Sequence, residues 1–328
     1  MKIIVPMAGR GSRLRPHTLT VPKPLIPIAG KPIVQRLVED ISKVCDETVD
    51  EIAFIIGDFG NEIEKNLINI AESLGAKGTI YHQEEALGTA HAILCAKESL
   101  TGNVVVAFAD TLFKADFTLD NSADGIIWVK QIENPSAFGV VKLNDSNEIT
   151  DFIEKPETFV SDLAIIGIYY FSDGEKLSIE LQYLIDNNIK EKGEFQLTNA
   201  LENMKAKGVK FKPGEVTEWL DCGNKEVTVN TNNKVLTLYK QYNSVPESAK
   251  TLLIDSSESC NGLKTTKFFC VDWLSFPDSS FQSNVPLIRR SPIRIFRRLE
   301  MRMVDLRSPC SRNTRKEKFS LSSDSSFF

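Results

Sequence analysis

Apolar positions along the first hundred residues follow two different spacings. Short continuous apolar runs predict strands at 3–5, 51–56, 79–83 and 103–109. Between them, apolar side chains recur every three or four residues at 33–41 and 63–74, and another helix is expected to open at 87–92. Strands that alternate with helices at this spacing predict an α/β fold with a doubly wound, mostly parallel sheet.

The regular alternation of predicted strands and helices ends at Asp110. Strand-like segments follow at 125–130, 138–143, 165–171, 209–212 and 216–220, and helical patterns at 177–185, 197–204 and 225–242. We expect this half to continue the sheet and to supply a second, smaller wall. The cleft between the walls would lie at the carboxyl ends of the strands, where ligands bind in open α/β sheets.

A glycine-rich segment directly follows the first predicted strand. Gly9 and Gly11 let the backbone turn tightly and present its N–H groups to an anion, and Arg13 and Lys23 add positive charge. The segment lacks the Gly-Lys-Ser/Thr ending of a Walker loop and the third glycine of a dinucleotide-binding turn. It therefore predicts a polyphosphate site, with an ordinary turn carrying solvated arginines as the alternative.

The segments GRGSRL, from Gly9 to Leu14, and KPLIP, from Lys23 to Pro27, together resemble the signature of the sugar-1-phosphate nucleotidyltransferases, or sugar nucleotide pyrophosphorylases. The resemblance covers residues 1–245 and is nearest to members that act like glucose-1-phosphate thymidylyltransferase. Ala8 stands where many members have glycine, and Ser12 where many have threonine. The resemblance implies a Rossmann-like sheet with a smaller sugar-binding wall and a catalytic domain over 1–245.

The implied reaction transfers a nucleotidyl group from a nucleoside triphosphate to a sugar 1-phosphate. The sugar phosphate attacks the α-phosphate in line, pyrophosphate leaves, and a nucleotide-sugar forms. The attacking phosphate is already ionised at neutral pH, so positioning and charge neutralisation would carry catalysis. Several subgroups have asparagine where Ile165 stands, which favours thymidylyl or uridylyl transfer to glucose 1-phosphate.

Two aspartates follow predicted strands. Asp110 comes after the apolar run at 103–109, and Asp221 lies in the sequence Trp-Leu-Asp-Cys-Gly. Mg²⁺ is typically held by one or two carboxylates together with substrate phosphates. The sequence therefore predicts an Mg²⁺ site at Asp110 and Asp221, although each could instead be a turn or helix-capping residue.

The resemblance assigns further residues to three groups. The nucleotide would be bound by Ala8, Gly9, Gly11, Ser12, Gln83 and Gly88, where a Gln amide can pair with the edge of a pyrimidine. The sugar would be bound by Gly139, Glu154, Gly167 and Glu194. Catalysis would fall to Arg13, Lys23, Asp110, Lys155 and Asp221, with Lys155 on the attacking phosphate. Three histidines, His17, His82 and His91, show no metal-ligand spacing and are interpreted as structural or solvent-facing.

Length, charge and cysteine content restrict the classes of protein to which the chain can belong. The chain of 328 residues can bury a sizeable core, and its net charge of −5 argues against a general nucleic-acid binder. No apolar run approaches the ~18 residues of a membrane helix, and no signal peptide is recognised. Six cysteines without CxxC spacing indicate reduced thiols in a cytoplasmic protein. The resemblance allows a homo-oligomer.

Residues 246–328 differ from the rest. Up to residue 250 the chain has 26 basic against 36 acidic residues, whereas beyond it 13 basic residues, mostly arginine, oppose 8 acidic ones, among many serines. This irregular tail could be a basic arm for an anionic surface, a disordered extension or, as we favour, the product of a frameshift.

Three other functions fit parts of the pattern. Guanylyl transfer to mannose 1-phosphate and cytidylyl transfer to phosphocholine would keep the chemistry and change the substrates. A non-catalytic regulatory relative would keep the fold and lose the reaction, but Arg13, Lys23 and both aspartates are present.

Overall fold

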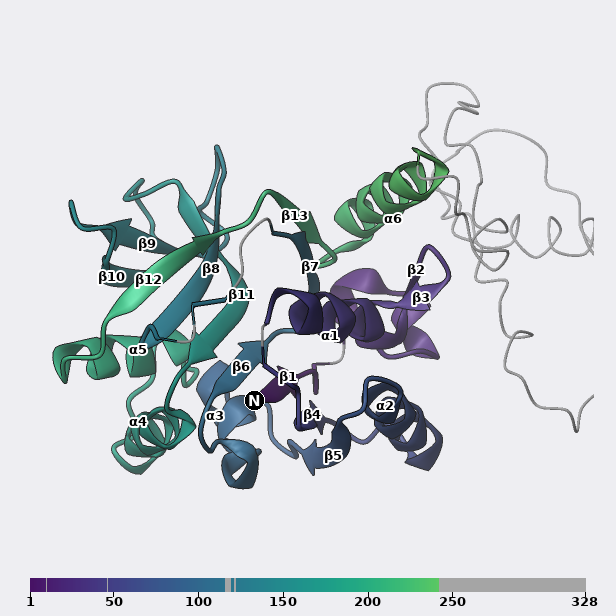
Figure 1. Ribbon diagram of the computed structural model, residues 1–328, viewed down its shortest axis with the longest axis horizontal. Helices are drawn as coiled ribbons and strands as arrows, with labels where there is room; N and C mark the ends of the chain where they lie inside the picture. Colours follow the sequence, from purple (N-terminus) through teal and green to yellow (C-terminus); the bar gives the residue numbers. More distant parts are fainter. Residues whose placement is uncertain (10, 46, 116–118, 121, 242–328) are drawn as a thin grey trace, which may run out of the picture. The chain divides into compact units, whose positions relative to one another are not determined.

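The computed structural model describes residues 1–241, except residues 10, 46, 116–118 and 121 (Figure 1). The predicted boundary at residue 245 and the three interpretations of the tail lie outside the described residues and stay predictions. Within them, the chain folds around a nine-stranded sheet.

This sheet has the strand order β10-β9-β11-β6-β1-β4-β5, and a branch from β11 through β8 to β12. Seven of its strands run in one direction, and only β10 and β11 oppose them. The α/β class with a mostly parallel sheet is thus confirmed. The strands are β1 (Lys2–Pro6), β4 (Glu51–Ile56), β5 (Lys77–His82), β6 (Val104–Ala107), β8 (Gly125–Gln131), β9 (Gly139–Leu143), β10 (Ile149–Glu154), β11 (Leu163–Phe171) and β12 (Phe211–Glu215).

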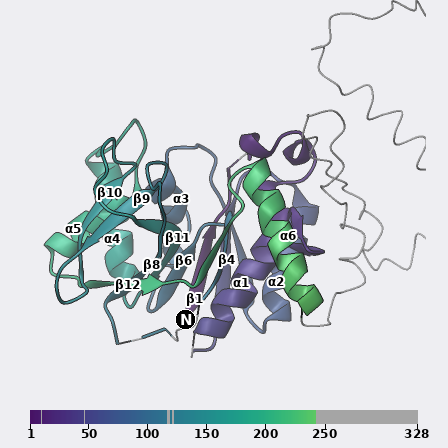
Figure 2. The same ribbon diagram turned by 90° about the horizontal axis from the view of Figure 1, so that it is seen from above.

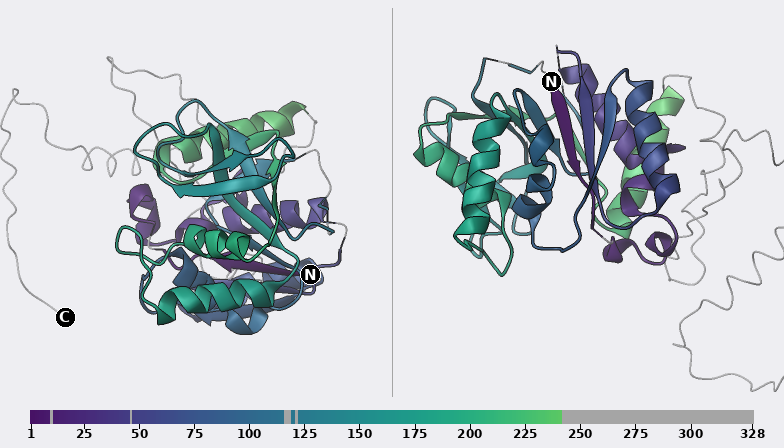
Figure 3. Two further views of the ribbon diagram at one scale, coloured as in Figure 1. Left: turned by 90° about the vertical axis from the view of Figure 1, so that its left-hand side faces the viewer. Right: turned by 90° about the horizontal axis from the view of Figure 1, so that it is seen from below.

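Helices cover both faces of the sheet (Figures 2 and 3). Successive side chains of a strand point to opposite faces, so Ile3 and Val5 of β1 join one core cluster while Ile4 joins the other. The first cluster includes α1 (Ile33–Val44), α2 (Asn61–Ser73) and α6 (Lys225–Gln241). The second includes α3 (Thr89–Leu94), α4 (Gly174–Asp186) and α5 (Leu197–Ala206). None of the helices in the described part of the chain has the length and apolar composition needed to cross a bilayer.

Two small strand pairs lie outside this sheet. In the first, β2 (Pro27–Ile28) and β3 (Lys31–Pro32) are joined by Ala29 and Gly30, both with positive φ, as in a tight hairpin turn. In the second, β7 (Thr111–Lys114) pairs antiparallel with β13 (Glu218–Asp221). Figure 1 shows β7 and β13 side by side. The second pair matters most, because it begins directly after one predicted metal ligand and ends on the other.

The strands β7 and β10 were not among the predicted elements. β7 follows Asp110 without a turn signal and has only four residues. β10 has the sequence Ile-Thr-Asp-Phe-Ile-Glu, in which apolar and polar residues do not alternate, so it lacks the pattern that predicts a strand. β10 ends on Glu154, and β7 pairs with the strand that carries Asp221.

Candidate functional site

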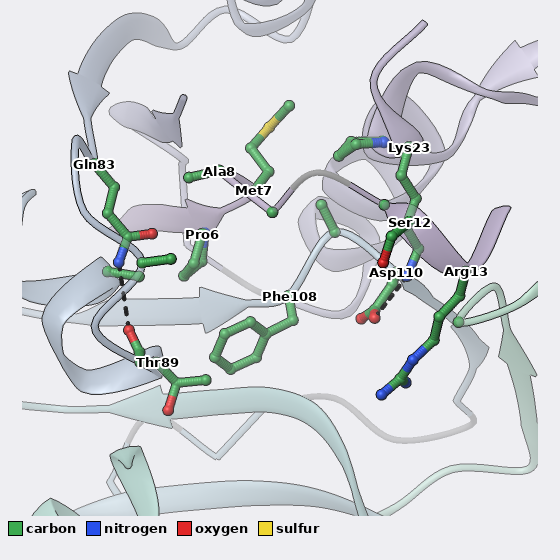
Figure 4. Close-up of a pocket in the computed structure, with 18 of the residues that line it drawn as sticks. Pro6, Met7, Ala8, Ser12, Arg13, Lys23, Gln83, Thr89, Phe108 and Asp110 are labelled. Carbon is green, nitrogen blue, oxygen red and sulfur yellow. Dashed lines mark hydrogen bonds and ion pairs between the residues drawn. The ribbon is translucent and has the colours of Figure 1, made fainter. Parts of the chain in front are cut away.

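A cavity of about 380 Å³ opens at the carboxyl ends of β1, β5 and β6. Figure 4 shows two polar groups of residues in it, with Phe108 between them. Arg13, Lys23 and Asp110 gather at one end, and Gln83 and Thr89 lie at the other. The place agrees with the rule that open α/β sheets bind ligands beyond the carboxyl ends of their strands.

The glycine segment forms the wall of the charged end. Gly11 has a φ of +60°, which favours glycine, and a Cβ there would lie 2.8 Å from Cβ of Lys23. The hydroxyl of Thr18 donates to the carbonyl of Gly11 at 2.7 Å and fixes the turn. The absence of a side chain at Gly11 therefore allows Lys23 to pack against the loop.

Lys23 forms an ion pair inside the cavity. Its Nζ donates to Oδ2 of Asp110 at 2.9 Å, and its side chain is only 13% exposed, whereas that of Asp110 is 46% exposed. Because the Lys23 side chain is largely buried, solvent and salt screen this ion pair less than they screen a pair on the surface. The ammonium group of Lys23 therefore lies beside Asp110, and both residues line the cavity.

Asp221 reaches the same place from the far end of the chain. It pairs with Thr111 in the β7–β13 ladder, and the N–H of Cys222 donates to the carbonyl of Asp110 at 2.9 Å. Oδ1 of Asp221 accepts from the N–H of Gly223 at 2.7 Å. The backbone therefore brings the two predicted metal ligands together.

Burial raises the pKa of the Asp221 carboxyl, and the neighbouring Asp110 adds to the rise, while Gly223 and Lys23 oppose it. Two carboxylates with one shared ammonium suit a hard divalent cation. Among the residues described, no group of three or more His, Cys, Asp or Glu is arranged so that it could hold a metal ion. A cation here would take its other oxygen ligands from water and substrate phosphates, as Mg²⁺ commonly does.

We expect Asp221→Asn to stabilise the metal-free protein near neutral pH. The pKa of Asp221 is raised by folding, so its ionisation opposes folding, and stability falls as pH rises from the ordinary carboxyl value of ~3.9 through the raised value. Asparagine does not titrate and keeps an oxygen for Gly223. Urea unfolding in EDTA between about pH 4 and about pH 8 measures the difference, which should favour the variant increasingly as pH rises. A difference that is independent of pH would contradict this expectation.

The other end of the cavity is built around Gln83 and Gly88. Gly88 has a φ of +118°, and a Cβ there would lie 2.5 Å from the carbonyl oxygen of Phe195. This close approach is fixed by backbone bonds in which Phe195 N donates to Leu87 O and Ala90 N donates to Phe195 O, both at 2.9 Å. Gly88 is therefore required by the packing of these two segments, and a flat ring could lie only against the part of Gly88 that lines the cavity.

Glu194 lies beside Gly88 and lines this same cavity. Glu194 was predicted to bind the sugar, but it lies with the predicted nucleotide-binding residues Gln83 and Gly88 and apart from the other three predicted sugar-binding residues. Its Oε2 accepts from Nε2 of Gln196 at 3.2 Å. The neighbouring Thr198 is buried, with no hydrogen-bond partner for its hydroxyl.

Glu154 and Lys155 form a second cluster where β10 ends. Nζ of Lys155 lies 3.2 Å from Oε1 of Glu154, and the Lys155 side chain is 52% exposed. Lys155 has a φ of +44°, and its N–H donates to the carbonyl of Phe138 at 3.2 Å. A Cβ on Gly139 would lie 3.2 Å from Oε2 of Glu154, so the absence of a side chain leaves room for that carboxylate, whose side chain is 15% exposed.

Tyr169 lies between the two clusters. Burial raises the pKa of its hydroxyl, and the carboxylates of Glu154 and Asp110 both contribute. Its ring packs edge-on against Phe108, which lines the cavity, at 6.1 Å between centroids. Gly167, with a φ of +88°, accepts from the N–H of Phe108 at a bulge in β11. The second cluster thus adjoins the cavity through Phe108 and Tyr169.

Most of the predicted site residues line the cavity. They are Ala8, Gly9, Gly11, Ser12, Arg13, Lys23, Gln83, Gly88, Asp110 and Glu194. Five do not line it: Gly139, Glu154, Lys155, Gly167 and Asp221. Thr89, next to the predicted Gly88, also lines it, as do Phe108 and Gly223, to which the sequence analysis assigned no binding role. Phe108 belongs to the apolar run before Asp110, and its place near the end of that run is the only feature of the sequence that could have indicated a position in the cavity.

Comparisons with known proteins identify the family of this chain. The family model described as nucleotidyl transferase matches residues 2–237. The low-salt glycan biosynthesis nucleotidyltransferase of Haloferax volcanii is 32% identical over 246 residues, which are 72% of this chain and 66% of the relative. The bifunctional protein GlmU of Methanocaldococcus jannaschii is 35% identical over 240 residues, which are 72% of this chain and 54% of the relative. The chain thus spans less than two thirds of either relative.

A solved structure shows the same fold. A putative glucose-1-phosphate thymidylyltransferase from Bacillus anthracis, in complex with sucrose, superposes with a TM-score of 0.60 at 23% identity. The superposition covers 71% of this chain and 94% of that one.

Proposed function

Because this chain belongs to the nucleotidyl transferase family, we propose that it transfers the nucleotidyl group of dTTP or UTP to glucose 1-phosphate and releases pyrophosphate. The observation that carries the proposal is the polarity of the cavity. Cationic side chains and a glycine turn stand at one end, and an amide beside bare backbone stands at the other. A nucleoside triphosphate has the same two ends, a polyanion and a flat base with hydrogen-bonding groups.

In the proposed reaction, an oxygen of the sugar phosphate attacks the α-phosphorus. The bond from that phosphorus to the bridging oxygen breaks, and pyrophosphate leaves with the electron pair. Arg13 and the turn at Gly9 and Gly11 hold the β- and γ-phosphates through forked and backbone N–H donors. Lys23 offsets charge at the α-phosphate. No proton transfer is required, because the nucleophile is already ionised.

Asp110 and Asp221 would hold Mg²⁺, which when bound neutralises charge on the phosphates as the transition state forms. The bond from the N–H of Cys222 to the carbonyl of Asp110 supports this assignment, because it holds the two aspartates close together. Burial, and then the neighbouring Asp110 charge, raise the pKa of Asp221 in the absence of a cation. Lys155 then aligns the attacking phosphate, and Glu154 accepts from sugar hydroxyls beside Gly139. The side chain of Ile165 lies beside Gly139, so the predicted sugar site has an apolar residue at this position. Several subgroups of the family have asparagine there, and this difference favours glucose 1-phosphate as the substrate.

The test is pyrophosphate release in a grid of substrates with Mg²⁺. The triphosphates dTTP, UTP, GTP, CTP and ATP are each combined with glucose 1-phosphate, mannose 1-phosphate, N-acetylglucosamine 1-phosphate and phosphocholine. We expect the highest kcat/KM for dTTP or UTP with glucose 1-phosphate, and none in EDTA.

Each other outcome has a meaning. Release with GTP and mannose 1-phosphate, or with CTP and phosphocholine, would replace the proposed substrates and keep the chemistry. Nucleotide binding without release, by protein shown to be folded, would favour a non-catalytic relative. Activity that is undiminished in EDTA would remove the metal from the mechanism.

A further inference from the structure

His91 contacts the glutamine at the base end of the cavity. Its Nδ1 lies 3.1 Å from Nε2 of Gln83, and the same Nε2 lies 3.4 Å from the carbonyl oxygen of Gly88. From the sequence, His91 is interpreted only as a structural or solvent-facing residue. The structure instead places it on α3, one turn into the helix that follows Gly88, with its ring against the Gln83 amide.

The Gly88 carbonyl identifies which amide atom of Gln83 faces the protein, and His91 is the closer of the two groups that hold that atom. A carbonyl oxygen can only accept, so the nitrogen of Gln83 and not its oxygen must face Gly88. Nδ1 of His91 then also accepts from this nitrogen, which places the imidazole proton on Nε2. In the opposite orientation, Oε1 of Gln83 would face the Gly88 oxygen, and two acceptors would meet with no proton between them.

With both N–H bonds directed at the protein, Gln83 has only its oxygen left for a ligand. Figure 4 shows the amide nitrogen on the hydrogen-bonded side and the oxygen turned away from it. Because Gln83 lines the cavity, that oxygen is an acceptor for whatever group lies beside Gly88. A base whose pairing-edge ring nitrogen carries a proton satisfies the acceptor at that atom, whereas a base whose ring nitrogen there carries a lone pair does not.

We propose that His91 is a specificity-determining positioning residue, which holds the Gln83 amide so that its oxygen selects a base with an imide N–H. Uracil and thymine carry that donor at N3, and cytosine carries a lone pair at the same atom. The inference rests on the proposed function in taking the base end of the cavity to hold a nucleotide base. It adds the residue that excludes cytosine, a base of nearly the same shape.

The decisive variants are His91→Leu and His91→Asn. Leucine keeps the bulk of the ring and removes the closer of the two acceptors, so that only the long 3.4 Å bond to Gly88 still holds the amide. The less firmly held amide can then rotate and offer its nitrogen to N3 of cytosine. Asparagine carries an oxygen near the position of Nδ1 and can restore the bond. We expect the ratio of kcat/KM for UTP over CTP to fall at least ~10-fold in His91→Leu, through KM, with kcat for UTP unchanged. The ratio in His91→Asn should stay near that of the unaltered protein.

A second readout requires no turnover. Nucleotide that binds only the folded state raises the melting temperature, so UTP should stabilise the unaltered protein and His91→Asn more than CTP does, and His91→Leu should lose the difference. This measurement separates the two proposals. Absence of pyrophosphate release would defeat the proposed function, and the loss of UTP-over-CTP stabilisation in His91→Leu would still support the positioning role.

Two results would overturn the inference. One is an unaltered protein that binds or uses CTP as well as UTP. The other is a His91→Leu variant whose melting temperature without nucleotide is normal and whose UTP-over-CTP ratio is unchanged in both measurements.

Discussion

Asp221→Ala is expected to lower kcat at least ~100-fold, because lost electrostatic stabilisers of a transition state commonly cost that much. Asp221 and Asp110 are joined by the β7–β13 ladder, and without Asp221 a cation would keep only one protein carboxylate. The expected signature is a large fall in kcat at saturating substrates, together with a higher Mg²⁺ concentration at half-maximal rate. Steady-state pyrophosphate release across an Mg²⁺ titration measures both.

Two companion variants make the result specific. Asp221→Asn keeps an acceptor for the Gly223 N–H and removes only the charge, so it should be nearly as slow as Asp221→Ala. Asp186→Asn changes an exposed aspartate at the end of α4 and should leave the rate unchanged. Near-normal turnover in Asp221→Asn would remove this residue from the metal site.

Lys155→Ala should raise the KM for the sugar 1-phosphate at least about tenfold, because a hydrogen bond to a charged group is lost. The residue lies in the cluster with Glu154 and Gly139, outside the cavity lining that would hold the triphosphate. Binding of the nucleoside triphosphate, measured by calorimetry without sugar, should therefore stay unchanged. Lys155→Arg keeps the charge and should recover part of the loss, since its longer planar group is not equivalent to an ammonium.

The control for Lys155 is Lys142, an exposed lysine on β9 in the same strand pair. Lys142→Ala removes an equal charge from the same region and should leave both substrates unaffected. If the two alanine variants behave alike, the effect is one of general surface charge, and Lys155 has no particular role at the phosphate.

The sequence predicted the parts of the site that local chemistry dictates. Gly11 has the positive φ expected of a glycine in a tight turn, and Asp110 follows a strand that is buried on both faces. Both features could be predicted from the residue type and its neighbours in the sequence. Strand and helix positions in the first half followed from periodicity in the same way, and β4 was predicted with its observed bounds. These features depend on residues near one another in the chain.

The features that were not predicted depend on distant contacts. Glu194 comes to Gly88 because Phe195 bonds to Leu87 and Ala90, and no pattern in either segment announces that pairing. His91 reaches Gln83 because the chain reverses at Gly88, and a lone histidine has no spacing to be read. Side-chain partners of this kind follow from tertiary geometry, which periodicity does not encode.

The β7–β13 pair has a consequence for how the site comes into being during folding. The glycine turn, Lys23 and Asp110 all lie in the first third of the chain, but the second carboxylate arrives only when Glu218–Asp221 closes on Thr111–Lys114. The entropy of closing such a long loop must be overcome before the two carboxylates meet. A chain interrupted before Glu218 would hold the whole of the proposed anion-binding turn but only one of the two carboxylates proposed to bind the cation. Under the proposed function, the phosphate-binding and cation-binding parts of the pocket therefore form separately during folding, and the cation-binding part requires an almost complete domain.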